Sequence, residues 1–385
     1  MTDSNRTQIT YIKESVYGVT PNTPQMQELR ITGESLNKNI NNKVSAEIRA
    51  DRQVTDLVQT SKTATGDINF ELSYGTFDDF LQSALFSTDW STPLAVSGTD
   101  IAADATGLTS SSTNFVAAGI QVGQMIKVDG FTGNTANNRI YRVTSVSNND
   151  LNLSPAPAAV DAAGETVTIK GSYIRNGVTK NSFTVEKGFL EISEYFKYIG
   201  MIVNTMSLTI KSEEILTGSF GLIGKDASLS GSSLDATPTA ATTTEVLNAV
   251  DDVASIREAG TEVTSPNYVE ELTIELNNNL RSRFAVGSDA LTSIGTGKCD
   301  ITGSLKTYFG DSSLMDKFIA GSKTSIDFTV KDAAGNAYLI DLPEVKFDSA
   351  NVVAQGQDQD VFAEMNYRAI RDAVYGFTIQ VCKFP

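Results

Sequence analysis

The sequence contains no histidine and only two cysteines, Cys299 and Cys382. Imidazole is the usual general base near neutral pH and the commonest metal ligand, so histidine-based catalytic sites and ordinary zinc sites are excluded. Two isolated cysteines in a chain without an export signal are more typical of buried free thiols than of a disulfide. We therefore expect free thiols, no cofactor, no metal site and no catalytic residues.

Long apolar runs are also missing. No stretch approaches the roughly 20 apolar residues of a membrane span, and the N-terminal segment MTDSNRTQITYIKES lacks a signal-peptide core, so we expect a cytoplasmic product. Positive charge is scarce, with 30 Lys and Arg against 46 Asp and Glu and a formal net charge of −16. Such a balance argues against a surface that grips nucleic acid, because phosphate binding needs clustered basic residues.

What the chain does contain is a strand-and-helix pattern that occurs twice. Residues 68–74 alternate apolar and polar side chains, as in a strand with one buried face, and residues 78–85 then follow helical spacing. A similar pattern returns over residues 296–320, where an alternating stretch again precedes a helical one. The simplest interpretation is one module used twice.

A second matching pair of segments, 28–39 and 271–279, supports the duplication. Matching Glu28 to Glu271 gives an offset of 243, whereas matching Thr65 to Thr296 gives 231. This difference predicts that the segment between the two strands is longer by 12 residues in the first copy.

The extra length falls in residues 37–62, a polar excursion that is too long for a tight hairpin. It is either a mobile loop or an extended arm that packs on another subunit, and its apolar side chains favour the arm. The candidate contact residues are Lys43, Ile48, Arg49, Arg52, Val54 and Leu57.

We therefore predict a mainly β protein with short helices, built from two tandem β-sandwich or barrel modules, the first interrupted by a small inserted all-β domain. The predicted segments are an N-terminal arm or disordered leader (1–27), the first part of module one (28–94), the insert (95–175), the second part of module one (176–225), a low-complexity linker (226–262) and module two (263–385).

Three chemical sites can be considered and set aside. The Asp332–Asn336 turn and the acidic run 341–348 lack the alternating oxygen ligands and closing carboxylate of a calcium loop. The glycines of GSFGLIGK lack the Gly-Lys-Ser/Thr end of a phosphate-binding loop. Asp67 and Glu71 form a carboxylate pair on one strand face, which is more often a solvated sheet surface than a catalytic pair.

Two stretches carry a resemblance to a known family. They are SFTVEKGFLEISEYFKYIGMIVNTMSLTIKSEEILTGSFGLIGK (182–225) and RADRQVTDLVQTSKTATGDINFELSYGTFDDFLQSALF (49–86). Both resemble the tail tube proteins of long non-contractile-tailed, siphovirus-type bacteriophages, and the resemblance spans most of residues 25–90 and 175–385. The insert is similar to the immunoglobulin-like or barrel-like decorations that such proteins carry.

This resemblance implies a structural virion protein, assembled in the host cytoplasm, whose rings stack around a channel for double-stranded DNA. Each module would give a β-sheet to an inner barrel and a helix to its flank, so the duplication predicts a trimeric ring with pseudo-sixfold symmetry. It implies as partners other copies of the chain, a tape measure protein, a tail terminator and a distal tail protein, while the DNA passes without specific binding.

Within that scheme, residues 37–62 would reach the adjacent ring, and Asp67 and Glu71 would face an acidic channel. An alternative hypothesis is a β-rich surface adhesin or receptor-binding protein, and a third is a hydrolase that uses carboxylates alone. Negative-stain microscopy discriminates the first two, because a tube protein gives rings or hollow tubes and an adhesin gives discrete oligomers.

Overall fold

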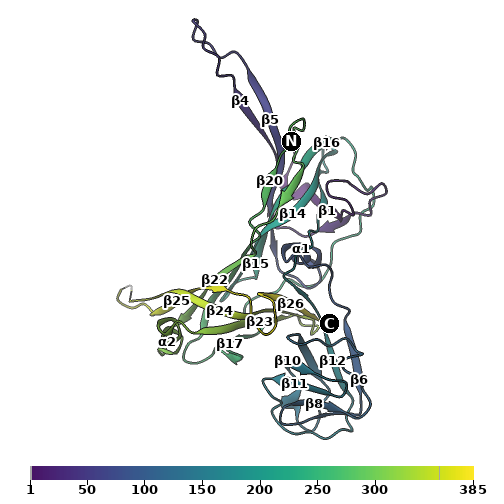
Figure 1. The fold of residues 1–385 in the computed structure, drawn as a ribbon, viewed down its shortest axis with the longest axis vertical. Helices are drawn as coiled ribbons and strands as arrows, with labels where there is room; N and C mark the ends of the chain where they lie inside the picture. Colours follow the sequence, from purple (N-terminus) through teal and green to yellow (C-terminus); the bar gives the residue numbers. More distant parts are fainter. Residues whose placement is uncertain (1, 355) are drawn as a thin grey trace.

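The computed structural model describes residues 2–354 and 356–385 and is mainly β, with two short α-helices. The prediction of a mainly β fold with short helices is confirmed. Figure 1 shows a long hairpin that projects from one end of the molecule, a sheet that extends to one side, and a separate group of short strands at the opposite end.

The first module surrounds α1 (Asp78–Ala84). Its strands are β1 (Thr7–Lys13), β2 (Gln27–Leu29), β3 (Gly33–Glu34), β4 (Asn37–Val44), β5 (Leu57–Glu71), β13 (Phe183–Phe189), β14 (Glu194–Lys211), β15 (Thr217–Gly224) and β16 (Asp226–Ser230). A 3-10 turn, Ser4–Arg6, precedes β1. All strand pairs are antiparallel, in the order β4–β5–β15–β14, and β13 and β16 flank the first half of β14.

The second module surrounds α2 (Ser313–Ala320) and repeats this strand order. Its strands are β17 (Val253–Glu258), β18 (Thr261–Glu262), β19 (Val269–Asn277), β20 (Arg281–Arg283), β21 (Ser293–Gly295), β22 (Asp300–Tyr308), β23 (Lys323–Lys331), β24 (Ala337–Val353), β25 (Phe362–Ala369) and β26 (Gln380–Phe384). The order is β19–β22–β25–β24, and β23 and β26 flank the first half of β24. Thus β19, β22, β25 and β24 correspond to β4, β5, β15 and β14.

The correspondence extends to single residues. The ladder of β14 and β15 shifts register between Val203 and Thr205, and that of β24 and β25 shifts at the equivalent place, between Phe347 and Ser349. Through these ladders Gly221 lies opposite Asp67, and Asn366 lies opposite Ser304. Asp67 therefore corresponds to Ser304, and Thr65–Gly66 corresponds to Thr302–Gly303, at an offset of 237 (302 − 65).

The offset predicted from the sequence was wrong, because it matched Thr65–Gly66 to Thr296–Gly297, which precedes β22. Leu36 faces Gly66 between the paired residues of β3 and β4, and Ile274 faces Gly303. The offset between the first strands of the two modules is therefore 238 (274 − 36), whereas the offset between their second strands is 237. The segment between the two strands is thus longer by one residue in the first module, and not by 12. Both modules carry a long hairpin at this place.

Gly66 and Gly303 occupy equivalent positions, and at both a side chain is excluded for the same steric reason. A Cβ atom on Gly66 would lie 2.5 Å from the Leu36 Cα, and one on Gly303 would lie 2.1 Å from the Thr273 carbonyl oxygen. Both distances are shorter than any normal contact, so a side chain at either position would push the neighbouring strand away. Gly66 also has a φ of 151°, which side chains rarely adopt.

The modules are joined through one further strand pair, in which Thr205–Lys211 of β14 lie antiparallel to Glu271–Asn277 of β19. The result is one continuous sheet in the order β4–β5–β15–β14–β19–β22–β25–β24. The chain therefore contains a complete junction between two modules.

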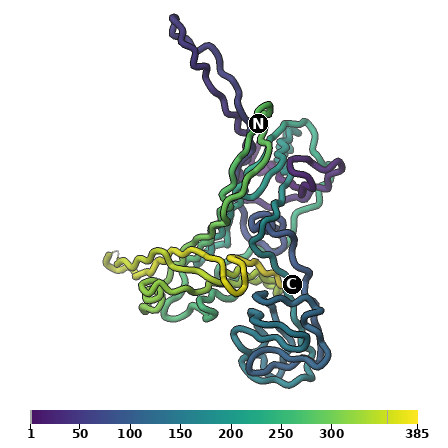
Figure 2. Tube along the Cα trace, in the orientation of Figure 1, coloured from purple at the N-terminus to yellow at the C-terminus, as the bar shows by residue number. Residues whose placement is uncertain are grey.

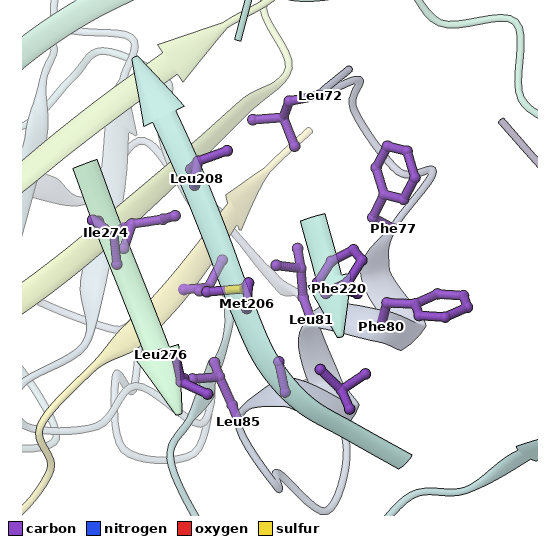
Figure 3. Packing of buried hydrophobic residues seen from close by; sticks show 14 of the residues in the cluster. Leu72, Phe77, Phe80, Leu81, Leu85, Met206, Leu208, Phe220, Ile274 and Leu276 are labelled. Carbon is purple, nitrogen blue, oxygen red and sulfur yellow. The ribbon is translucent and has the colours of Figure 1, made fainter. Parts of the chain in front are cut away.

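One apolar core lies against one face of this sheet and runs through both modules. In α1, acidic residues open the first turn, and the five residues that follow, from Phe80 to Ala84, are all buried. Figure 3 shows Leu81 between Met206 and Phe220 of the sheet, and the ring centroids of Phe77 and Phe80 lie 6.2 and 5.4 Å from that of Phe220. The backbone that follows α1 turns at Phe86 (φ 50°), and the C-cap of α2 is Gly321 (φ 61°).

A group of short strands with an apolar core of its own enters the first module directly after this helix-ending turn. Its elements are β6 (Leu94–Gly98), β7 (Ile101–Ala103), β8 (Gly107–Ser110), β9 (Met125–Asp129), the 3-10 turn Thr135–Asn137, β10 (Ile140–Val146), β11 (Asp150–Ser154) and β12 (Val167–Arg175). In the second module the same place holds only Ser322, between Gly321 and β23.

The insert is fastened to the second module. The last residues of β12, from Ser172 to Arg175, pair with β26. In addition, the Arg142 guanidinium donates two hydrogen bonds to the buried Asp341 carboxylate, at 2.8 and 2.6 Å. A buried bidentate pair of this kind fixes orientation, because either charge without its partner would be costly to bury.

Two segments differ from the sequence-based expectation. The predicted arm contains β1, which pairs along its whole length with β13 and buries Ile9 and Tyr11. The predicted linker begins with β16, and further along the Leu247 N–H donates to the Leu72 carbonyl while the Leu247 carbonyl accepts from the Leu216 N–H. Residues 37–62, predicted as a mobile loop or an extended arm, form most of the extended hairpin of β4 and β5.

Candidate functional site

The face of the continuous sheet that points away from the core is polar across both modules. One row of cross-strand neighbours illustrates it, because each residue lies opposite the next: Asn69, Ser219, Ser207, Glu275, Thr302 and Arg368. The residues between them along each strand, such as Ile68, Phe220 and Leu276, belong to the core. The strict period-2 alternation therefore separates a polar face from an apolar one.

Side-chain hydrogen bonds link neighbouring strands on this polar face. Ser207 and Ser219 hydroxyls lie 2.8 Å apart, as do those of Thr273 and Ser304. At the far side, the Asn366 amide donates to the Ser349 hydroxyl at 2.8 Å. These hydrogen bonds tie short polar side chains of neighbouring strands to one another.

Acidic side chains outnumber basic ones on the polar face. The acidic residues are Asp67, Glu71, Glu271, Glu275, Asp300 and Glu364, and the basic residues are Lys211, Lys306, Lys346 and Arg368. Most of the basic groups are already paired: Lys306 with Glu270 at 2.9 Å, Lys211 with Glu214 at 2.7 Å, and Arg368 with Asp300. The charge available to a passing ligand is therefore mainly negative.

The structure brings both predicted wall residues, Asp67 and Glu71, to the polar face. Asp67 is exposed and lies opposite Gly221, while Glu71 is half-buried opposite Thr217. Their partners on the neighbouring strand carry small side chains, so the carboxylates are not covered from that side.

The six predicted contact residues all lie on the hairpin of β4 and β5, which we call the first hairpin (residues 37–71). Lys43 and Leu57 belong to its paired strands, and Ile48, Arg49, Arg52 and Val54 lie in the tip (45–56). All six are exposed, and Ile48 is fully so. Figure 2 shows this hairpin projecting beyond the rest of the chain.

A second hairpin, which the sequence analysis did not predict, contains β20 and β21 (residues 278–299) and lies along the first module (Figure 2). Its Leu291 and Ile294 are buried against Phe86 and Ile202. Lys62 of the first hairpin donates its backbone N–H to the Asp289 carbonyl and forms an ion pair with the Asp289 carboxylate. The sequence signal that could have predicted this second hairpin is the Gly287–Ser288–Asp289 turn, which lies between short apolar stretches.

Within the described residues, no cluster of potential ligands could hold a metal ion. No helix in this part of the chain has the length and apolarity that crossing a membrane requires. The prominent features of the molecule are therefore its polar sheet face, its open sheet edges and its projecting hairpin.

A comparison with protein families decides between the hypotheses, because the profile of the phage tail tube protein family matches residues 4–369, nearly the whole chain. The chain belongs to the phage tail tube protein family. A search of curated proteins finds no match. The predicted resemblance is confirmed, and the tail tube protein is a structural component of the phage tail that assembles with copies of itself.

Proposed function

We propose that three copies of this tail tube protein form a ring with pseudo-sixfold symmetry, and that such rings stack into a hollow tube. The observation that carries the proposal is the internal junction of β14 with β19, which joins two modules of the same strand order into one sheet. Three chains would supply six such modules, and closing the sheet removes edges that would otherwise pair promiscuously.

The polar face lines the channel in this proposal. The opposite face is covered by α1, α2 and the core, and therefore points outward. Each contact between a basic side chain and a phosphate contributes on the order of 1 kcal/mol, and many rings would add up to a strong hold on the DNA. An acidic, hydrogen-bonded wall avoids that hold, and its repulsion is screened over about 8 Å at physiological salt.

The first hairpin reaches the adjacent ring in this proposal. Its apolar side chains, among them Ile48 and Val54, are fully or largely exposed, and such side chains on a projecting hairpin need a partner surface. Arg49 is already paired with Asp51 at 2.6 Å, so Lys43 and Arg52 are the basic residues of the hairpin that could meet an acidic group of a neighbour.

Other partners follow from the family. We infer that the tube surrounds a tape measure protein during assembly in the host cytoplasm, is closed by a tail terminator and starts from a distal tail protein. Double-stranded DNA then passes through the channel during ejection without specific binding.

Mass measurement of isolated rings and negative-stain microscopy of concentrated protein test the proposal. We expect rings with the mass of three chains and hollow tubes built from them. Rings of six chains would contradict the pseudo-sixfold arrangement, and discrete oligomers that bind cells would favour an adhesin.

The acidic wall has its own test in the double variant D67K/E71K. We expect assembled tubes of this variant to bind short double-stranded DNA at low salt and to release it as salt increases, whereas wild-type tubes do not bind it. A matched double variant at the turn between β13 and β14, E191K/E194K, controls for total charge. Equal DNA binding by both variants would place Asp67 and Glu71 away from the channel.

A further inference from the structure

The internal junction leaves two open sheet edges at opposite ends of the chain. Residues 347–353 of β24 pair with β25 on one side, and β4 pairs only with β5. In the described part of the chain, neither edge has a backbone partner on its other side. Open edges of this length need a partner or protection.

These two edges correspond to the two strands that already meet inside the chain. The first open edge belongs to β24, which corresponds to β14, and the second belongs to β4, which corresponds to β19. The chain therefore contains one paired junction, β14 with β19, and also the two equivalent strands, β24 and β4, as open edges.

We propose that β24 of one subunit pairs antiparallel with β4 of the next, in the register of the internal junction. The proposal rests on the ring proposed above and specifies how it closes. Adding 144 (349 − 205) to a residue number in β14 gives the equivalent residue in β24, and subtracting 238 (274 − 36) from one in β19 gives the equivalent residue in β4. Applied to the pairs of β14 and β19, these offsets place Asn37 opposite Asn351, Lys38 opposite Ala350 and Asn39 opposite Ser349.

The side chains match in this register. Asn37 and Asn39 lie on the polar face, as do Asn351 and Ser349, so the polar face continues across the subunit boundary. On the other face, Lys38 lies opposite the small Ala350, which leaves room for its stem. The Lys38 ammonium is already held by Asp226 at 2.7 Å. A slip of one residue would reverse the faces.

The ends of the new ladder are also defined. The Leu36 carbonyl already accepts hydrogen bonds from Lys187 and Tyr198 of its own chain, both at 2.9 Å, so the ladder begins at Asn37. At the other end, the internal junction has a hydrogen bond from the Asn278 N–H to the Asn204 carbonyl at 2.8 Å. Its equivalent joins Ile40 to Asp348 of the neighbouring subunit's β24.

The helices give a second, independent indication. At the internal junction, Leu81 of α1 lies beside Phe328 and Tyr338 of the second module. The corresponding helix α2 lacks such a cover, and its Ile319 is 74% exposed. A neighbouring subunit seated on the β24 edge would bring its own first module over α2.

Disulfide cross-linking of the full-length protein tests the register. In N37C/N351C the two thiols lie opposite each other across the proposed boundary, where Cβ atoms of paired strands are close enough for a disulfide. We expect covalently closed trimers on non-reducing gels after mild oxidation, and monomers after reduction. The single variants N37C and N351C should give no trimers.

Two matched variants calibrate the result. S207C/E275C places cysteines at the equivalent pair of the internal junction and should form a disulfide within one chain. N37C/S349C tests a register slipped by two residues and should cross-link much less than N37C/N351C.

The outcomes separate this inference from the proposed function. If wild-type protein forms trimeric rings and S207C/E275C oxidises, but N37C/N351C does not cross-link or the slipped pair cross-links better, the register is wrong and the ring remains. Covalent rings of another size would keep the strand pairing and overturn the trimer. An absence of rings, tubes and cross-links would overturn both.

Discussion

The two hairpins occupy equivalent places in the two modules but have opposite surroundings. Leu57 of the first hairpin and Ile294 of the second are equivalent through the offset of 237, yet Leu57 is 58% exposed and Ile294 is 2% exposed. The second hairpin is buried by the first module of its own chain, whereas the first hairpin has no corresponding module beside it. The apolar surface of the first hairpin is therefore open in the single chain.

The receiving surfaces differ as well. Ile294 packs on Phe86 and Ile202, and the equivalent positions of the second module hold Gly321 and Lys346. A glycine and an exposed lysine cannot receive apolar side chains in the same way. The first hairpin therefore cannot dock on a second module in the way that the second hairpin docks on the first module. This difference agrees with the proposed role of the first hairpin between rings.

The largest effect is expected from removing the first hairpin. Replacing residues 41–61 with Asn-Gly connects the paired residues Ile40 and Lys62 through a turn that suits antiparallel strands. We expect a folded, soluble subunit that forms rings but no tubes, as judged by sedimentation and negative-stain microscopy. Tubes of normal length would show that the hairpin does not connect rings.

A smaller effect should come from truncating the equivalent apolar side chains. I294A removes a fully buried side chain and should cost about 2 to 4 kcal/mol of unfolding free energy. L57A should stay within about 0.5 kcal/mol in the unassembled subunit, because its side chain is largely exposed, but should weaken polymerisation. Urea denaturation and light scattering measure the two quantities. Equal stability losses would mean that both hairpins are docked in solution.

The smallest effect concerns the thiols. Burial raises the pKa of Cys299, which lies just before β22, to about 11, and burial also raises the pKa of the fully buried Cys382. Because only the thiolate reacts, both should react slowly with Ellman's reagent at pH 8 in the native protein. In I294A, Cys299 should react faster if the second hairpin detaches, while Cys382 stays slow. Rapid labelling of wild-type Cys299 would contradict the raised pKa of this half-buried thiol.

Local patterns predicted much of this structure from the sequence. The helix at residues 78–84 and the hairpin turn at residues 332–336 are present, and the predicted alternation holds from residue 68 to Glu71, where β5 ends, because these features depend on neighbouring residues. Beyond that point it fails, since Ser73 is buried. The polar positions of Asp67 and Glu71 followed from the same alternation.

Long-range relations were beyond the same reasoning. The Thr296–Gly297 pair precedes β22 and the Thr302–Gly303 pair lies within it, so the sequence offers two possible equivalents of Thr65–Gly66. Only the ladder of β22 with β25 identifies Thr302–Gly303 as the equivalent pair. The N-terminal strand β1 is bounded by polar residues and reads as an arm until its pairing with β13 is known. The second hairpin was missed because its apolar side chains are few and gain their burial from a distant module.

The position of the insert has a practical consequence. A whole domain replaces a turn between a helix and a strand without disturbing the sheet on the far side of the core, and the second module keeps that turn short at Gly321–Ser322. A foreign domain with adjacent termini, grafted between Gly321 and Lys323, would therefore decorate the exterior of the assembled particle. Phage tails carrying two kinds of appendage in alternation could be built from this one polypeptide.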